Sequence, residues 1–347
     1  MKFKVLCFCL VFVMSFTLFG CDEKKTENNS ESKSSFTEKT TSSLSDENKT
    51  AAKSKALKSK TTTTTTGTRE YKPAPVNINQ YNKYSFSMSG FDTVTSINDF
   101  NDYLDELQNV ISDCNFNISF SYENMDTGAY ISCNETKKYA TCSTIKTPFA
   151  GSLLKSGIDI NQKITKTVNW PGDGGYVANI KTGTQLTVKQ LIRYAVQRSD
   201  NTAYYNLVKH FGYTQFNSDL RSIGANYSLG DSWIFTYCTS ADMLKCYKEI
   251  YKYGEKTDLG KWLINLMQDT DVNRQIGKAL DSKYEVSQKY GSDYSEKQYH
   301  DCAIVYADSP FVLCIFTNQY PETDQSDKVF IEIANIIDRI NNVIYIK

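Results

Sequence analysis

Hydrophobic and polar residues follow regular periods only beyond about residue 95, and there they predict a folded domain. Five apolar residues recur at the spacing of a helix that is buried on one face. They are Phe100, Tyr103, Leu104, Leu107 and Ile111. After them, residues 118–122 alternate apolar and polar as in a half-buried strand, and the sequence Asp-Thr-Gly at 126–128 predicts a turn.

The rest of the domain has a helical middle and a second group of strands. We expect helices at 143–155, 187–197 and 202–210, strands at about 301–307 and 311–317, and a last helix over 330–344. Strands therefore flank the helical segment, so an antiparallel sheet must be assembled from both ends of the domain around an all-helical insert. Antiparallel hairpins with segregated helices define the α+β class. An apolar share of 40% is ample for a packed core.

The first twenty residues have a different pattern. Lys2 and Lys4 precede an apolar run at 5–19, which is too short for an ordinary membrane span and is typical of a secretory signal. The run ends in Gly20-Cys21, which resembles a bacterial lipoprotein processing site. We expect an extracytoplasmic protein anchored to the cell membrane through lipid on Cys21. A plain signal peptide with an incidental cysteine is the alternative.

Residues 21 to about 90 lack the apolar content of a folded domain. Lys, Glu, Ser, Asn and Thr dominate, and six threonines follow one another at 61–66. Such a composition cannot bury enough surface to offset its chain entropy, so we expect a disordered tether. The predicted organisation is a lipoprotein signal peptide at 1–20, a tether at 21–90 and one domain at 91–347.

Charge and cysteine content narrow the function classes. The formal net charge is zero, and no basic stripe or zinc-type spacing of Cys and His occurs, so we expect no nucleic-acid partner and no metal. Cys302 and Cys314 lie on two apolar runs joined by a turn, so a disulfide across a hairpin is one reading. Buried free thiols are the other. The seven cysteines concerned are Cys114, Cys133, Cys142, Cys238, Cys246, Cys302 and Cys314.

Three Ser-x-x-Lys patterns raise the question of which serine is a nucleophile; they begin at Ser30, Ser143 and Ser152. A serine hydroxyl needs a nearby base, and a lysine three residues later lies on the same helix face. Ser143 begins its predicted helix, where its own N–H is unpaired and free to bind an anion. Ser152 is mid-helix and Ser30 is in the tail. The chain has only two histidines, His210 and His300, and neither is a good candidate for the base of a Ser-His-Asp triad.

A second polar segment, Ser-Asp-Asn at 199–201, interrupts the helical middle and is a good turn in its own right. Together with Ser-Thr-Ile-Lys at 143–146 it resembles the penicillin-recognising serine enzymes, most closely the class A β-lactamase branch. The family's third motif, Lys-Thr/Ser-Gly on an edge strand, corresponds to Lys-Tyr-Gly-Ser at 289–292. Literal matches at 155–157 and 181–183 come too early in the chain. The resemblance covers roughly residues 96–346 and implies a class A β-lactamase/transpeptidase-like fold.

The resemblance also implies a role for each matching residue. Ser143 would accept the acyl group, and Lys146 would take its proton directly or through a water. Ser199 would relay a proton toward the leaving nitrogen. Asn201 would hold Lys146 and the substrate amide.

The substrate-binding side follows in the same way. Lys289 would attract the substrate carboxylate and help keep Lys146 neutral. The backbone N–H groups of Ser143 and Ser292, with Gly291 between Lys289 and Ser292, would form the oxyanion hole. Tyr176 is expected either as an aromatic wall of the cleft or as a surface loop tyrosine.

Two departures from the family pattern bear on the substrate. Class A β-lactamases carry a Glu on a long loop after the Ser-Asp-Asn turn, and it activates the water that frees the acyl-enzyme. No Glu occurs between Ser199 and Lys248, and we do not expect Asp231 to replace it. Tyr290 stands where the family has Thr or Ser. Its phenol would narrow the cleft, meet a different acceptor, or be a tolerated change.

Three functions therefore remain open. The first is a surface-tethered serine hydrolase that forms an acyl-enzyme with β-lactams or with amides and esters of similar shape. The second, favoured by the missing Glu, is a D,D-peptidase or transpeptidase acting on peptidoglycan stem peptides. The third is a non-catalytic binding or sensor module that keeps the fold. None of them needs a cofactor, and we expect a monomer.

Overall fold

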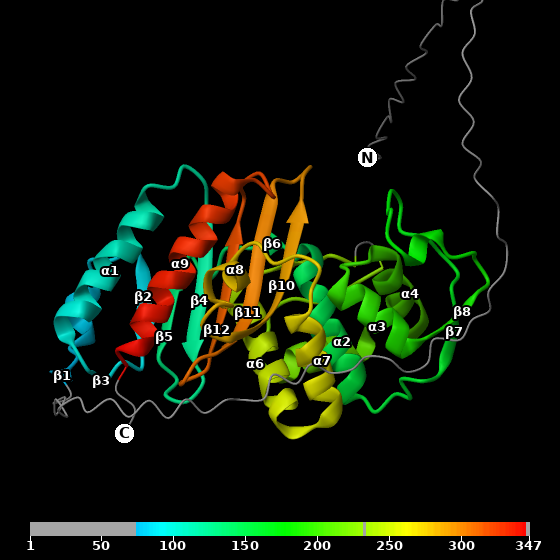
Figure 1. Cartoon of the computed structure of the whole chain (residues 1–347), viewed down its shortest axis with the longest axis horizontal. Helices are drawn as coiled ribbons and strands as arrows, with labels where there is room; N and C mark the ends of the chain where they lie inside the picture. The colour runs from blue at the N-terminus through cyan, green and yellow to red at the C-terminus, as the bar shows by residue number, and fades with distance from the viewer. Residues whose placement is uncertain (1–73, 232–233, 345–347) are drawn as a thin grey trace, which may run out of the picture. The chain divides into compact units, whose positions relative to one another are not determined.

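The structure is a computed structural model that describes residues 74–231 and 234–344 (Figure 1). The predicted signal peptide, Cys21 and most of the predicted tether lie outside these residues and stay predictions. Among the described residues, no helix is long and apolar enough to cross a membrane.

A six-stranded sheet, in which every neighbouring pair is antiparallel, forms the centre of the domain. The strand order is β10-β11-β12-β4-β5-β2. The bounds are β2 Phe86–Ser89, β4 Ile118–Asn124, β5 Tyr130–Cys133, β10 Glu285–Asp293, β11 Gln298–Tyr306 and β12 Phe311–Thr317. Early and late strands meet where β12 pairs with β4. The expected α+β class, with a sheet assembled from both ends of the domain, is confirmed.

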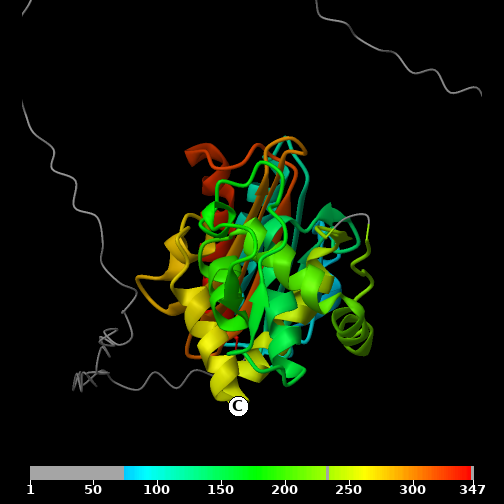
Figure 2. The same ribbon diagram turned by 90° about the vertical axis from the view of Figure 1, so that its right-hand side faces the viewer.

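Helices cover both faces of this sheet. α1 (Ile97–Ser112) packs on α9 (Asp324–Asn342) over one face, together with the short α8 (Ile276–Leu280). The helical insert lies beside the other face, and Figure 2 shows its green and yellow helices in front of the sheet. Its helices are α2 Lys146–Lys155, α3 Val188–Gln197, α4 Asn201–Phe211, α5 Thr214–Ser222, α6 Ser240–Lys256 and α7 Asp258–Gln268. One hydrophobic cluster fills each side of the sheet.

Short elements complete the described part of the chain. The two-stranded pairs are β1 (Ala74–Pro75) with β3 (Thr93–Val94), β6 (Tyr139–Ala140) with β9 (Tyr237–Cys238), and β7 (Lys163–Thr165) with β8 (Gln185–Thr187). The 3-10 helices are η1 Ile78–Tyr81, η2 Cys142–Ile145 and η3 Val177–Asn179.

Strand β4 is buried on both faces, although its alternation predicts a half-buried strand. Ser119 and Ser121 are fully buried, because α6 covers the face to which they point. Both hydroxyls hydrogen-bond the Ser240 Oγ at the start of α6, at 2.7 and 3.0 Å. Hydroxyls that satisfy one another in this way can occupy a buried face, so a polar alternation does not always mark solvent.

The domain begins earlier than the predicted boundary at residue 91. β2 pairs with β5 at the edge of the main sheet, and Tyr81 and Phe86 are buried in the cluster that α1 and α9 cover. The predicted boundary was wrong because residues 74–90 contain few apolar residues and adjoin a long polar segment, so the apolar content of 21–90 as a whole is low. Phe86 and its serine neighbours alternate as a short strand does.

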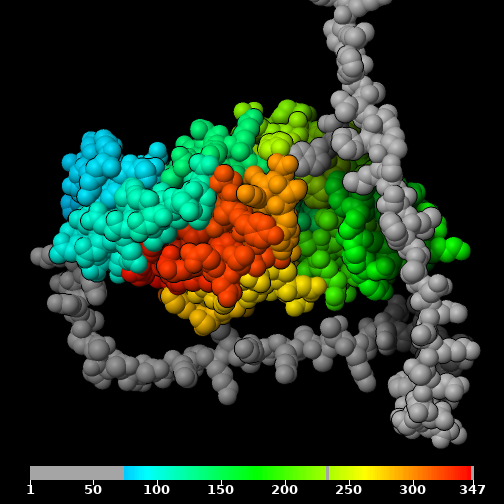
Figure 3. All heavy atoms as spheres, turned by 90° about the horizontal axis from the view of Figure 1, so that it is seen from above, coloured from blue at the N-terminus to red at the C-terminus, as the bar shows by residue number. Residues whose placement is uncertain are grey.

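The chain's first and last described segments lie side by side. The Thr95 N–H donates to the Val343 carbonyl at 2.8 Å, and Val94 bridges to Ile344. Figure 3 shows the cyan α1 segment against the red C-terminal segment on one face of the molecule. Ends that are held together in this way are typical of a self-contained domain.

Cys302 and Cys314 face each other as directly paired residues of β11 and β12, as the hairpin predicts. Both are buried free thiols here, as are the other cysteines within residues 74–231 and 234–344 apart from the half-buried Cys114. Burial raises the pKa of the Cys302 thiol well above its ordinary value, so it packs as an unreactive side chain.

Phe86→Ala should lower the free energy of unfolding by about 3 kcal/mol, because it removes a buried aromatic ring from β2. Ser87→Ala, at an exposed neighbouring position, should change it by less than about 0.5 kcal/mol. Urea unfolding of the full chain measures both. Equal, small effects would place β2 outside the cooperative domain.

Candidate active site

The first turn of the insert presents Ser143 to the open cleft. The predicted helix at 143–155 is a 3-10 turn, η2, followed by α2, and Ser143 is partly exposed while its neighbours in η2 are buried. Cys142, with φ +47°, turns the chain sharply just before it. A Cβ placed on Gly291 of β10 would lie 2.9 Å from the Ser143 nitrogen. Only glycine therefore allows the edge strand β10 to come so close to the serine.

Lys146 lies fully within the protein and touches Ser143 on the same helical face. Its Nζ is 2.9 Å from the Ser143 Oγ, 2.5 Å from the Ser199 carbonyl oxygen and 2.6 Å from the Asn201 Oδ1. The Ser199 Oγ is farther away, at 3.4 Å. The structure thus brings together four of the residues that the sequence predicted.

Three of these contacts can be made by the neutral amine as well as by the ammonium, and the lowered pKa favours the neutral form. The Ser199 carbonyl and the Asn201 Oδ1 only accept, so they take the two N–H bonds of an uncharged Lys146. Its remaining lone pair then faces the hydroxyl of Ser143. Burial, followed by the nearby charge of Lys289, holds the pKa of Lys146 well below its ordinary value. The amine is therefore suited to accept the serine proton.

The Ser199–Asn201 turn is held from two sides. Ser199 has φ +54°, and the next residue, Asp200, caps α4 by accepting from the Ala203 N–H at 2.7 Å. The second oxygen of Asp200 accepts from the Val177 N–H at 2.8 Å. The turn that the sequence predicted is therefore pinned to an adjoining loop, and it points the Ser199 carbonyl at Lys146.

Lys289, on β10, is a second buried lysine at the site. Desolvation lowers its pKa to about 7, although Asp301 and Asp271 nearby oppose the shift. Its Nζ lies 4.7 Å from the centre of the Tyr290 ring. Among the described residues, it has no hydrogen-bonded acceptor or ion-pair partner. Its side chain is only 1% exposed and is not among the residues that line the cleft beside Ser143.

Tyr290 points away from the cleft. Its ring packs into the cluster shared with α8 and α9, and burial raises its pKa to about 12. It is directly opposite Asp301 in the sheet register. The structure therefore gives no support to the interpretation in which the phenol of Tyr290 narrows the cleft.

The cleft beside Ser143 has a volume of about 140 Å³. The residues that line it are Ala140, Cys142, Ser143, Trp170, Asn201, Phe235, Ser292 and Asp293. Tyr176 is not among them; it is 57% exposed and stacks on Tyr194 at 4.6 Å. The aromatic walls are instead Trp170 and Phe235, which contact each other edge to face at 5.1 Å. Single aromatic residues in long loops carry no periodic signal, so the sequence did not identify them.

No glutamate lines the described part of the cleft. Asp231 accepts from the Tyr213 hydroxyl at 2.9 Å and is not among the described lining residues. Asp293 is the charged residue among the described lining residues, and the motifs of the sequence did not predict it. No cluster of metal-binding side chains occurs within residues 74–231 and 234–344.

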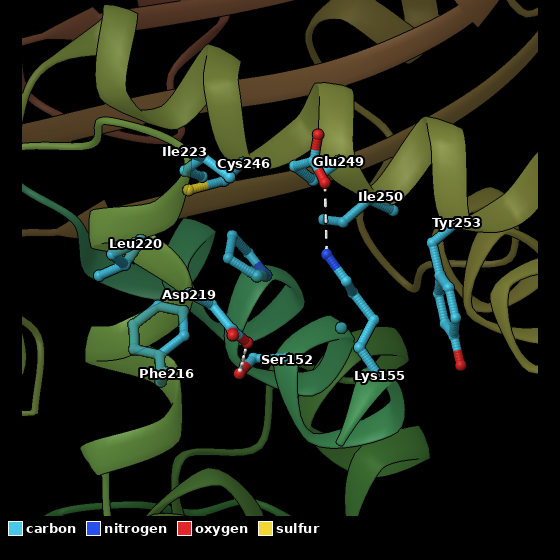
Figure 4. A pocket seen from close by; sticks show the side chains of 12 residues that line it. Ser152, Lys155, Phe216, Asp219, Leu220, Ile223, Cys246, Glu249, Ile250 and Tyr253 are labelled. Carbon is cyan, nitrogen blue, oxygen red and sulfur yellow. Dashed lines mark hydrogen bonds and ion pairs between the residues drawn. The ribbon is translucent and has the colours of Figure 1, made fainter. Parts of the chain in front are cut away.

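The second Ser-x-x-Lys pattern has a structural role. Figure 4 shows that the Ser152 hydroxyl points to Asp219, which accepts from it at 2.5 Å, whereas Lys155 pairs with Glu249 at 3.3 Å. Serine and lysine are thus engaged with different partners. Lys155 is therefore not placed to act on Ser152 as Lys146 is on Ser143.

His300 also has a structural role. Its Nδ1 accepts from the Thr317 N–H at 3.2 Å, so the proton lies on Nε2, which donates to the Ala140 carbonyl at 2.9 Å. Burial lowers its pKa to about 4. The neutral imidazole thus ties β11 to β6, next to the cleft.

The fold is that of the class A β-lactamases and transpeptidases. The β-lactamase of Sphaerobacter thermophilus has 16% identity and a TM-score of 0.60, over 70% of this chain and 98% of that one. The class A β-lactamase of Mycobacterium abscessus has 17% identity and a TM-score of 0.59, over 70% and 100%. PBP-A, solved as a mutant in an acyl-enzyme complex with penicillin G, has 15% identity and a TM-score of 0.60, over 68% and 94%. A model of the beta-lactamase enzyme family matches residues 103–341, and the chain belongs to that family.

Replacement of Lys289 by Arg should change how acylation depends on pH. The resemblance implies that Lys289 binds a substrate carboxylate, which it would attract only when it is charged. Because its pKa is about 7, the second-order rate constant should then fall as the pH rises through 7. An arginine stays charged across this range, so Lys289→Arg should abolish the fall. Stopped-flow acylation by a penicillin between pH 6 and 9 measures it. If the pH profile of the rate constant is the same in Lys289→Arg as in the wild-type protein, the fall comes from the titration of a group other than Lys289.

Proposed function

We propose that the protein is an active-site serine hydrolase. In it, Ser143 would accept the acyl group of β-lactams and of amides or esters of similar shape. The contact between the Ser143 Oγ and the neutral Lys146 Nζ, at 2.9 Å, carries this proposal. A non-catalytic module would have no need to keep a buried lysine uncharged beside a partly exposed serine.

The chemistry uses groups already in contact. Lys146 takes the Ser143 proton as the Oγ attacks the substrate carbonyl, and the resulting oxyanion is placed against the backbone N–H groups of Ser143 and Ser292. Collapse of the tetrahedral intermediate breaks the carbon–nitrogen bond. The proton on Lys146 passes by way of the Ser199 hydroxyl to the leaving nitrogen, which restores the neutral amine.

Release of the acyl group is the step for which the described cleft is poorly equipped. Hydrolysis of the ester needs a base to activate a water, and no glutamate is present in the described lining. This favours a second candidate function, a penicillin-binding D,D-peptidase or transpeptidase, in which the acyl group comes from a peptidoglycan stem peptide and another nucleophile accepts it. The acylation step is the same in both.

We also propose that the domain acts outside the cytoplasm, tethered to the membrane by lipid on Cys21. The support is the charged start, the short apolar run and the Gly20-Cys21 pair, followed by a long polar segment. A peptidoglycan substrate would lie within reach of such a tether.

Intact-mass spectrometry of the full chain with benzylpenicillin tests the proposal. We expect a covalent adduct that persists for many times its formation time. An adduct that clears while the drug is hydrolysed would make the protein an efficient β-lactamase and would remove the support for the peptidase. A folded protein that never forms an adduct would contradict β-lactam recognition.

Lys146→Ala should slow formation of this adduct by about 10²- to 10⁴-fold, because it removes the general base. Lys155→Ala is the matched control, since it removes the lysine of the other Ser-x-x-Lys pattern on the same helix. It should leave the rate unchanged. Similar losses in both variants would show that the effect comes from damage to α2.

A further inference from the structure

One face of the edge strand β10 carries a positively charged residue on one side of Gly291, Lys289, and a negatively charged residue on the other side, Asp293. Side chains alternate along a strand, so Lys289, Gly291 and Asp293 belong to the same face. Gly291 lies against Ser143, which marks the place of the reacting carbonyl. Lys289 lies about 7 Å to one side of that point and Asp293 about 7 Å to the other, at two residues each.

Asp293 is held so that one oxygen stays available. Its Oδ1 accepts from the Ser295 N–H at 2.9 Å, the Ser295 hydroxyl at 2.6 Å and the Glu296 N–H at 3.0 Å. These bonds outweigh its burial and lower its pKa, so the carboxylate is charged at neutral pH. No cation within the described residues forms an ion pair with it.

The rest of this end of the cleft favours positive charge as well. Glu322 accepts from the Ser292 hydroxyl at 3.0 Å and from the Tyr294 hydroxyl at 2.7 Å, so a second carboxylate stands behind the lining. Trp170 and Phe235 form aromatic walls of the same cleft. A carboxylate together with aromatic faces is the combination that binds ammonium groups.

We propose that Asp293 is a specificity-determining residue that selects substrates with an ammonium group on the acyl side of the reacting carbonyl. Such a substrate is zwitterionic: its carboxylate meets Lys289, its carbonyl meets Ser143 beside Gly291, and its ammonium meets Asp293. An anionic group at the same place is repelled. This inference rests on the proposed acylation of Ser143.

Three penicillins that differ only at the α-carbon of a phenylacetyl side chain provide the test. Ampicillin carries an ammonium there, benzylpenicillin a hydrogen and carbenicillin a carboxylate. The second-order acylation rate of the full chain is measured with each at low ionic strength. We expect ampicillin to react about tenfold faster than carbenicillin, with benzylpenicillin between them.

Asp293→Asn keeps the Oδ1 acceptor and removes only the charge, so the hairpin keeps its hydrogen bonds. We expect the ampicillin-to-carbenicillin ratio to fall about tenfold; because the readout is a ratio, a change in rate that is common to all three drugs does not affect it. Glu296→Gln is the matched control; this exposed residue of the same hairpin carries the same charge and does not line the cleft. It should leave the ratio unchanged.

The wild-type protein gives a second readout that needs no variant. Raising the salt concentration from about 0.05 to about 0.5 M should reduce the ratio, because salt screens a partly exposed charge. A ratio that Asp293→Asn and salt both leave unchanged, with all three drugs still reacting, would overturn the role of Asp293 alone. Failure of every drug to acylate the wild-type protein would instead overturn the proposed function, and this inference with it.

Discussion

The arrangement of the site depends on burying the amine of Lys146 without its charge. Burial of an ammonium is costly, and among the described residues no carboxylate pairs with Lys146; its partners there are a backbone carbonyl, a side-chain amide and a hydroxyl. The nearby Lys289 adds to the cost of a proton there. The neutral amine is the form that these surroundings stabilise, and it is also the form that can act as a base.

The fold holds these groups together from segments that are far apart in the chain. Ser143 and Lys146 come from the start of the insert, Asn201 begins α4, and Lys289 lies on the edge strand β10. Gly291 lets β10 lie directly against η2, and His300 ties the next strand to β6 through Ala140. The geometry of the site therefore depends on the packing between the sheet and the insert. The proposed chemistry uses only side chains and backbone groups of the chain.

Much of this could be predicted from the sequence, and the misses share a cause. Elements with strong periodicity, such as α1, β12 and α9, lie close to their predicted places, and Ser143, Lys146, Asn201 and Lys289 follow from ordered motifs. β2 was missed because its few apolar residues adjoin a long polar segment. Trp170 and Phe235 were missed, and Tyr176 was left open as an aromatic wall or a surface tyrosine, because loop conformation decides which isolated side chains reach a cleft. Asp293, the last residue of β10, was also missed.

The most direct test of the central claim is to locate the acyl group after reaction with benzylpenicillin. Trypsin cuts after lysines 138, 146 and 155, so Ser143 and Ser152 fall on the separate peptides 139–146 and 147–155. Tandem mass spectrometry of the digest then identifies the modified residue. The account predicts that the penicilloyl group is on Ser143 and that peptide 147–155 is unmodified. A penicilloyl group on Ser152, or on any residue outside the cleft, would contradict it.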